Sequence, residues 1–286
     1  MPEGDSVLQL SRRLQFMTGR EVLHTSLRVP SVALTDFTGE LVDRVWPYGK
    51  HLFMQFGERI LHTHLKMEGT WAVHRVGDRW RKPGHTARVV LQLADTHPIE
   101  VVGHSLGLVR VFPTDHYHEQ TAHLGPDVLG EDWPTGGREE ARRRILAQPA
   151  ATIGEALLEQ RNLAGVGNEY RAEICFLCGI HPARRVADVD VDHVLDVTRR
   201  VMWANRDAPV RVTTGIRRAG ETTYVFGRHG RPCRRCRTPI RRAWLGPAAE
   251  ERIIWWCPAC QPAAPDYVAV PVVPAGRTPR GARYRR

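Results

Sequence analysis

The sequence predicts a multidomain α+β protein: an N-terminal β domain that begins with a helix, a helical domain, and a cysteine-bearing β-hairpin near the end. Three observations predict this class. Short β-like segments dominate residues 21–113, helical spacing takes over beyond residue 126, and two Cys-x2-Cys pairs follow. A chain of 286 residues has room for two or three such modules and a substantial core.

The first element is a helix that follows Pro2. Apolar residues recur at helical spacing from Val7 to Met17. We expect Asp5 or Ser6 to cap the start of this helix. Pro2 then lies at the positive end of the helix dipole, which disfavours an ammonium group and helps to keep an amine neutral.

The next elements are short segments rich in Val, Ile, Leu and aromatic residues, separated by turn signals such as Tyr48-Gly49 and Pro83-Gly84. The predicted strands are residues 41–46, 51–56, 60–65, 71–74, 87–93 and 100–102. Several short strands at this spacing indicate a β-sandwich or barrel rather than alternating βαβ units.

Helical segments follow a stretch at Trp133–Gly137 that is typical of an interdomain linker. The predicted helices are residues 138–147, 153–160, 168–178 and 191–205. A β-like stretch begins at Thr222, and the Pro-, Ala- and Arg-rich sequence from Pro262 is expected to be disordered. We therefore divide the chain into residues 1–133, a linker and connecting helix at 134–152, and further units at 153–225, 226–261 and 262–286.

The charge is concentrated at the C-terminal end. The net charge is +10, and residues 226–286 carry 13 arginines against three acidic residues, which accounts for the whole excess. A polyanion, above all nucleic acid, is the expected partner. No apolar run is long enough to span a bilayer and no secretory leader is visible, so we expect a cytoplasmic protein with no membrane partner.

Four cysteines have the spacing of a tetrahedral zinc site held by the two turns of a hairpin. They are Cys233, Cys236, Cys257 and Cys260, and twenty residues separate the two pairs. The arginines around them favour a finger that binds a nucleic acid backbone over a zinc site with a purely structural role. By contrast, Cys175 and Cys178 lie on a predicted helix and are interpreted as two buried thiols rather than a second metal site.

The first residues carry a possible nucleophile. An initiator Met1 before a small residue is usually removed, which leaves Pro2 with a free secondary amine. When neutral, this amine attacks an aldehyde and forms a cationic iminium, a strong electron sink. Glu3 is adjacent and can move protons. The alternative is an ordinary terminal proline.

Three further motifs suit DNA. Glycines in Leu163–Asn168 allow a tight turn, and Asn168 opens a helix whose N-terminal amides attract phosphate, unless this is a plain N-cap. Lys50 starts a strand directly after a turn, where most lysines are simply solvated. Met67 lies in a charged turn and fits an apolar wedge that unstacks DNA, or is simply a surface residue.

Together these motifs resemble the formamidopyrimidine-DNA glycosylase/endonuclease VIII family. The resemblance is nearer the endonuclease VIII branch, is of actinobacterial type and covers residues 1 to about 261. The motifs that carry it are Pro2-Glu3-Gly4, Gly49-Lys50, the Leu163–Asn168 turn, Arg252 five residues before Cys257, and the four cysteines.

The resemblance implies a β-sandwich, a helix–two-turn–helix DNA-binding domain and a β-hairpin finger with one structural Zn2+ per chain. It also implies a monomeric, nucleoid-associated enzyme of base excision repair that acts on double-stranded DNA with oxidised bases or abasic sites. Pro2 is then the nucleophile that attacks C1′ and Glu3 the proton carrier, with strand cleavage by β,δ-elimination.

The same resemblance implies DNA contacts for four residues. Lys50 contacts phosphate near the lesion, Asn168 and Arg252 hold the flanking phosphates, and Met67 fills the space left by the flipped nucleotide.

Two departures matter. Ser6 stands where the family usually has a glutamate, so the resemblance assigns no third catalytic carboxylate. Residues 103–108 lack the Arg and Phe with which the formamidopyrimidine branch probes the opposite strand, which favours oxidised pyrimidines over 8-oxoguanine as substrates. Two alternatives stay open: a non-catalytic zinc-dependent binder of damaged DNA, and an abasic-site lyase with weak glycosylase activity.

Overall fold

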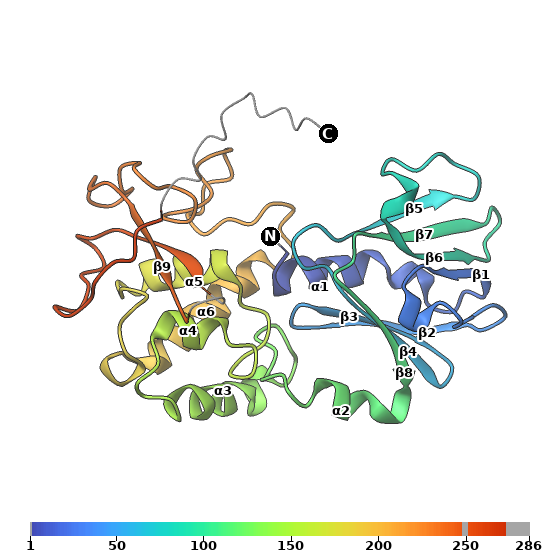
Figure 1. The fold of residues 1–286 in the computed structure, drawn as a ribbon, viewed down its shortest axis with the longest axis horizontal. Coiled ribbons are helices and arrows are strands. Elements are labelled where there is room, and N and C mark those ends of the chain that lie inside the picture. The colour runs from blue at the N-terminus through green and yellow to red at the C-terminus, as the bar shows by residue number, and fades with distance from the viewer. Residues whose placement is uncertain (1, 248–250, 273–286) are drawn as a thin grey trace, which may run out of the picture.

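The chain forms two halves side by side (Figure 1). The computed structural model describes residues 2–247 and 251–272. The N-terminal half is a β-sandwich preceded by helix α1, and the C-terminal half holds helices α3 to α6 and the hairpin of β9 and β10. This confirms the predicted α+β architecture and the order of its parts.

Two four-stranded antiparallel sheets make up the sandwich, in the orders β1-β6-β7-β5 and β2-β3-β4-β8. The strands are β1 (Val22–Leu27), β2 (Val42–Tyr48), β3 (His51–Phe56), β4 (Arg59–His64), β5 (Thr70–Arg75), β6 (Ala87–Leu93), β7 (Ile99–His104) and β8 (Leu108–Pro113). The six predicted strands are confirmed. The segments of β1 and β8 were not predicted. Strand β1 mixes polar and apolar residues and pairs along the more apolar β6, whereas β8 is largely apolar and pairs along β4.

The sandwich core lies between the two sheets and is closed on one side by α1 (Gly4–Arg13). Phe37 and Phe56 stack in this core with ring centroids 4.2 Å apart. Val7 and Leu10 of α1 join the same core, whereas Leu8 packs against the core of the C-terminal half. Helix α1 therefore contacts both halves with different faces.

Helix α1 begins one residue earlier than its expected caps. Glu3 occupies the N-cap position with extended backbone and makes no side-chain cap bond. The expectation that Asp5 or Ser6 caps the helix is therefore wrong, since both lie inside the first turn. Pro2 directly precedes this turn, at the positive end of the helix as expected. The expected removal of Met1 concerns a residue outside the described ranges.

The helices of the C-terminal half follow the predicted segments. They are α3 (Gly137–Leu146), α4 (Ile153–Leu158), α5 (Asn168–Leu177) and α6 (Val191–Asn205), and a short α2 (Tyr117–Thr121) connects the halves. Thr152 and Glu155 form a capping box at α4, and the Asp190 side chain caps α6. Trp133, in the stretch expected to be a linker, is 3% exposed and belongs to the helical core.

Residues 206–240 form turns rather than the β-like stretch expected from Thr222. The buried Glu173 of α5 explains why. Its carboxylate accepts the backbone N–H groups of Tyr224, Val225 and Phe226 at 2.7, 2.9 and 2.9 Å. The backbone donors that would pair with a neighbouring strand are thus satisfied by one side chain.

The hairpin of β9 (Arg241–Leu245) and β10 (Arg252–Trp256) follows, and the chain then runs back along it. The Trp244 backbone N–H donates to Val270 O at 2.9 Å, and the Tyr267 ring contacts Trp256. Disorder was expected from Pro262 onwards, but within the described residues 262–272 both Tyr267 and Val270 contact the hairpin. The rest of the expected tail, 273–286, lies outside the described residues.

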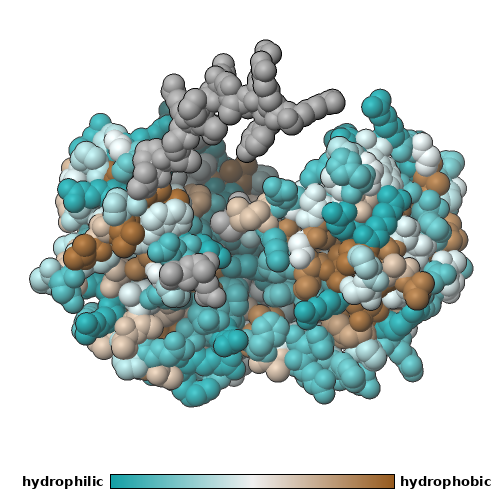
Figure 2. All heavy atoms as spheres, viewed as in Figure 1, coloured by the Kyte–Doolittle hydropathy of each residue, from teal (hydrophilic) through white to brown (hydrophobic). Residues whose placement is uncertain are grey.

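The surface carries both hydrophobic and hydrophilic residues (Figure 2). On the face in Figure 2, hydrophobic residues gather mainly on the N-terminal half, while hydrophilic residues dominate the strip between the halves. The described part of the chain holds no helix with the length and apolar character of a membrane span.

The Glu173 anchor gives a stability prediction. Glu173→Ala leaves three backbone donors without an acceptor, so we expect the free energy of unfolding to fall by about 3 kcal/mol or more. Urea denaturation measures this loss. Glu139→Ala, at a 69% exposed surface ion pair, is the matched control and should change stability by less than about 0.5 kcal/mol. Equal effects of the two substitutions would contradict the anchor.

Candidate active site and DNA interface

The chain start meets the Leu163–Asn168 turn at the junction of the two halves. The Gly4 N–H donates to Gly165 O at 2.9 Å. A Cβ on Gly4 would lie 3.0 Å from Gly165 Cα, and a Cβ on Gly167 would lie 2.4 Å from Glu3 Cδ. Glycine is therefore required by close approach of the two segments, rather than by the turn alone.

The Tyr48-Gly49 turn packs on the same place. Gly49 has φ +55°, and a Cβ there would lie 2.7 Å from Ala164 Cβ. Its N–H donates to Asp127 Oδ2 at 2.8 Å, and Asp127 Oδ1 accepts the Leu129 N–H at 2.9 Å. These contacts bring Lys50 to the junction.

Glu3 is completely buried at the beginning of α5. Its carboxylate accepts the backbone N–H groups of Gly167 at 2.6 Å, Glu169 at 2.9 Å and Tyr170 at 3.4 Å. Burial raises the pKa of Glu3, while the charges of Arg211 and Lys50 and the Glu169 N–H oppose that rise. A buried carboxylate held between these influences is suited to exchanging protons.

Lys50 supplies a cation next to this carboxylate. Burial lowers the pKa of Lys50 to about 8, Glu3 acts against that shift, and Arg211 and Arg252 reinforce it. The ammonium is thus mainly protonated at neutral pH. The influence of Arg252 shows that the finger reaches the same region.

Asn168 connects the start of α5 to the hairpin. Gly167 takes the N-cap position, so the plain N-cap interpretation of Asn168 is wrong. The Asn168 Nδ2 donates to Ile253 O at 3.2 Å, and Arg171 Nη2 donates to the same oxygen at 2.9 Å. The residue before Ile253 is Arg252, which is therefore held close to α5.

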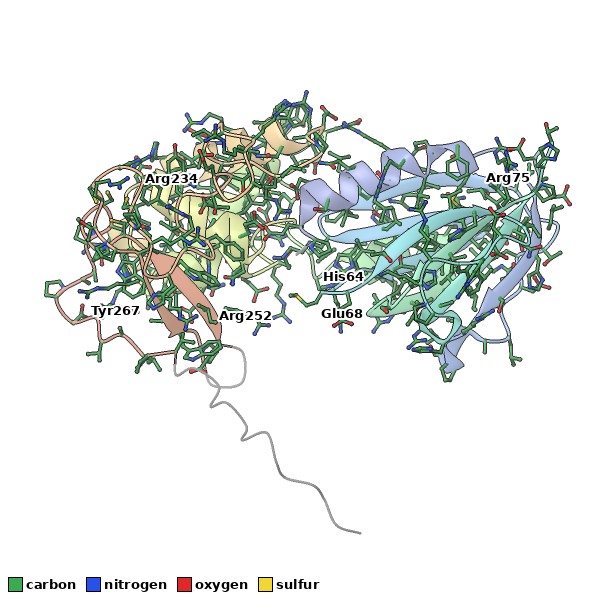
Figure 3. All side chains as sticks on the ribbon, turned by 90° about the horizontal axis from the view of Figure 1, so that it is seen from above. His64, Glu68, Arg75, Arg234, Arg252 and Tyr267 are labelled. Atoms are coloured by element: carbon green, nitrogen blue, oxygen red, sulfur yellow. The ribbon has the colours of Figure 1, made fainter. Side chains whose placement is uncertain are left out.

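The turn between β4 and β5 faces the finger. Met67 is 65% exposed in this turn, which Lys66 enters with φ +49°. Figure 3 shows Arg252 at the edge of the hairpin, with His64 and Glu68 across from it. His64 Nδ1 accepts the Lys66 N–H at 2.8 Å, and burial lowers the pKa of His64 to about 4, so its ring is neutral.

The neighbouring segment after β7 is short and tightly packed. Ser105 has φ +49°, Leu106 is buried, and a Cβ on Gly107 would lie 2.4 Å from Lys66 Cδ. The segment thus packs against the Met67 turn where Gly107 meets Lys66. Its one large apolar side chain, that of Leu106, points into the core.

The four cysteines of the two Cys-x2-Cys pairs converge at the base of the hairpin. All four sulfur atoms lie within 4.8 Å of one another, with Cys233 and Cys260 4.0 Å apart and Cys236 and Cys257 3.3 Å apart. Sulfur atoms at Zn–S bonds of about 2.3 Å around a tetrahedral ion are separated by roughly 3.8 Å. The cluster therefore fits a structural zinc ion.

Cys175 and Cys178 do not join a metal site. In the described part of the chain no second group of three or more potential ligands converges. Burial raises the pKa of both thiols to about 12, so they stay protonated. The interpretation as two buried thiols is confirmed for Cys175, whereas Cys178 is only partly buried.

Two residues of the site were not singled out in the sequence. Asp127, which holds the Lys50 turn, follows Gly125 and Pro126 but has no motif of its own. Arg211 forms ion pairs with Asp5 and Glu169 and lies in a segment without periodicity. Only the three-dimensional arrangement identifies them.

Two family profiles match the chain. Residues 1–104 match the formamidopyrimidine-DNA glycosylase N-terminal domain, and residues 124–207 match the formamidopyrimidine-DNA glycosylase H2TH domain. Both matches fall on the parts that meet at the junction described above.

Relatives match over the whole length. A probable endonuclease 8 2 of Streptomyces coelicolor is 42% identical, with all of both chains covered. A DNA-(apurinic or apyrimidinic site) lyase of Mycolicibacterium smegmatis is 40% identical, covering 92% of this chain and all of the relative.

The fold is also that of a solved structure. Lactococcus lactis formamidopyrimidine-DNA glycosylase, non-covalently bound to DNA with an abasic site, superposes with a TM-score of 0.72 at 21% identity, over 91% of this chain and 100% of that one. The profiles and the full-length relatives show that this chain belongs to the formamidopyrimidine-DNA glycosylase/endonuclease VIII family, the glycosylases and abasic-site lyases of base excision repair.

Proposed function

We propose that this chain is a bifunctional DNA glycosylase and abasic-site lyase that uses Pro2 as its nucleophile. The observation that carries the proposal is the burial of Glu3 against the amides of α5, directly beside Pro2 and within the electrostatic influence of Lys50. A pure DNA binder has no need for a buried carboxylate next to a terminal amine.

The reaction proceeds through an imine. The Pro2 nitrogen attacks C1′ of the damaged nucleotide, the bond from C1′ to the base breaks, and the base leaves with a proton. Glu3 delivers the proton that opens the sugar ring and yields the iminium. The iminium acidifies the C2′ proton, the now ionised Glu3 accepts it, and the C3′–O bond breaks with the phosphate as the leaving group. Loss of a second sugar proton then breaks the C5′–O bond and releases the other phosphate.

The DNA is held by residues of three elements. Lys50 contacts phosphate near the lesion, and Asn168 and Arg252 hold the flanking phosphates from α5 and β10. The exposed Met67 enters the duplex where the nucleotide leaves the stack. Structural neighbours bound to DNA that contains an abasic site support damaged DNA as the partner.

Catalysis and DNA binding are assigned to different parts of the chain. We assign residues 1–133 to catalysis, 153–225 to DNA binding by the helix–two-turn–helix, and 226–261 to the zinc finger. Residues 134–152 connect the first two units. This division follows the positions of the site residues.

Imine trapping tests the nucleophile. With borohydride and a duplex carrying one abasic site, the wild-type chain should form a covalent adduct that peptide mapping places at Pro2. In Pro2→Gly, which lacks the secondary amine, we expect at least about a hundredfold less adduct, with DNA affinity changed by less than about twofold. Lys66→Arg, on the exposed turn, is the matched control and should trap normally.

Each other outcome of trapping is informative. An adduct at Lys50 or Lys66 would replace Pro2 as the nucleophile. DNA binding without any adduct would leave the non-catalytic binder. An adduct with abasic DNA but no base release from an intact lesion would leave the lyase with weak glycosylase activity.

Removal of zinc should abolish the finger contacts. Without the ion, nothing joins the four sulfur atoms that lie within 4.8 Å of one another, and the ends of the hairpin that carries Arg252 are no longer held together. We expect one zinc per chain by elemental analysis, and DNA affinity about tenfold or more weaker for Cys257→Ser. Cys178→Ser is the matched control and should keep both zinc and affinity. A zinc-free chain with normal affinity would contradict this role.

Substrate preference follows from residues 103–108. The segment contains neither Arg nor Phe, and Leu106 in its loop between β7 and β8 points into the core, so residues 105–107 present no large side chain to probe the opposite strand. We therefore expect oxidised pyrimidines to be released at least about tenfold faster than 8-oxoguanine. Single-turnover base release from matched duplexes measures the ratio. Faster release of 8-oxoguanine would overturn the preference.

A further inference from the structure

Arg211 connects three acidic side chains at the junction. Its Nε donates to Asp5 Oδ2 at 2.9 Å and its Nη2 to Asp5 Oδ1 at 2.5 Å, a bidentate pair. Its Nη1 donates to Glu169 Oε2 at 2.9 Å and lies 3.6 Å from Glu3 Oε1. The Arg211 side chain is only 10% exposed, so these pairs are poorly screened by water.

Tyr170 completes this arrangement. Its ring lies under the guanidinium, with Arg211 Cζ 4.5 Å from the ring centroid, and its hydroxyl donates to Asp5 Oδ2 at 2.9 Å. Ser6 Oγ accepts a further bond from Arg211 Nη2 at 3.2 Å. Asp5 and Ser6, first expected to cap α1, thus connect its first turn to α5 and to the segment after α6.

We propose that Arg211 is a positioning residue for the proton transfer by Glu3: its guanidinium holds α1 against α5 and neutralises the two carboxylates beside Glu3. The inference rests on the proposed function, in which Glu3 moves protons. It assigns to Arg211, Asp5 and Glu169 a role in the reaction without contact to the substrate.

The charges around Glu3 explain why one guanidinium matters. Besides the Pro2 amine that precedes it in the chain, the titratable and charged groups that face or influence Glu3 are Asp5 from α1, Lys50 from the turn after β2, Glu169, Tyr170 and Arg171 from α5, and Arg211. Without Arg211, three carboxylates remain close together in a buried place. Since like charges disfavour ionisation, Glu3 would then keep its proton to higher pH.

The consequence for the reaction has a definite sign. Burial raises the pKa of Glu3 and the charge of Arg211 opposes the rise, so loss of that charge raises the pKa further. Whether a step needs Glu3 ionised or protonated, the limb of the pH–rate profile set by Glu3 moves to higher pH. Loss of the Asp5 charge acts in the opposite direction and moves the same limb to lower pH.

The test is the pH profile of strand cleavage at a pre-formed abasic site under single-turnover conditions. We expect Arg211→Met to move the Glu3 limb up by about one pH unit, and Arg211→Lys, which keeps the charge, to restore most of it. Asp5→Asn should move the limb down. Arg12→Gln is the matched control, because the exposed Arg12–Asp207 pair also joins α1 to the segment after α6 but lies outside the group around Glu3.

A purely structural role predicts something else. In that case Arg211→Met and Asp5→Asn lower the unfolding temperature, and the Glu3 limb of the pH–rate profile stays in place or moves in the same direction in both variants. Either result would overturn the inference. If Arg211→Met does not fold, Asp5→Asn decides the question, because only the proposed role predicts a downward move of its limb. Absence of any trapped adduct in the wild-type chain would instead refute the proposed function, which separates the two failures.

Discussion

The buried carboxylate of Glu3 is the contact on which the arrangement of the two halves depends. Its oxygens take up backbone donors at the beginning of α5, donors that a helix start must satisfy in some way. Glu3, which belongs to another domain, thus binds the N–H groups that a capping side chain of α5 would otherwise bind. Glu3 thus joins the chain start to the Gly167 turn, and Asn168 at the start of the same helix joins that turn to the finger.

Burial of a carboxylate away from water is energetically unfavourable unless other groups compensate its charge. Several groups of the site do so. Helix amides, the partly buried ammonium of Lys50 and the guanidinium of Arg211 all act on Glu3. The same groups that stabilise the folded junction therefore set the proton affinity of the proposed catalyst. Stability and chemistry draw on the same contacts here, so each constrains the other.

The sequence predicted the elements with local signals and missed those whose cause lies elsewhere in the chain. Richness in apolar and aromatic residues between turn signals identified β3 and β6, and the spacing of the cysteines identified the metal-binding hairpin. The turns after α6 were mistaken for β structure because their backbone partner, Glu173, lies about fifty residues away. Arg211 could not be identified from the sequence for the same reason, since its role depends on an ion pair with Asp5 near the start of the chain.

Helix α1 faces two cores at once, and this has an evolutionary consequence. Leu10 is fitted to the β-sandwich, whereas Leu8, half a turn away, is fitted to the helical half. Neither half can change its packing at this surface independently of the other, because both adjust to one short rigid element. Exchange of domains between distant relatives should therefore succeed only when α1 is inherited together with both of its neighbours.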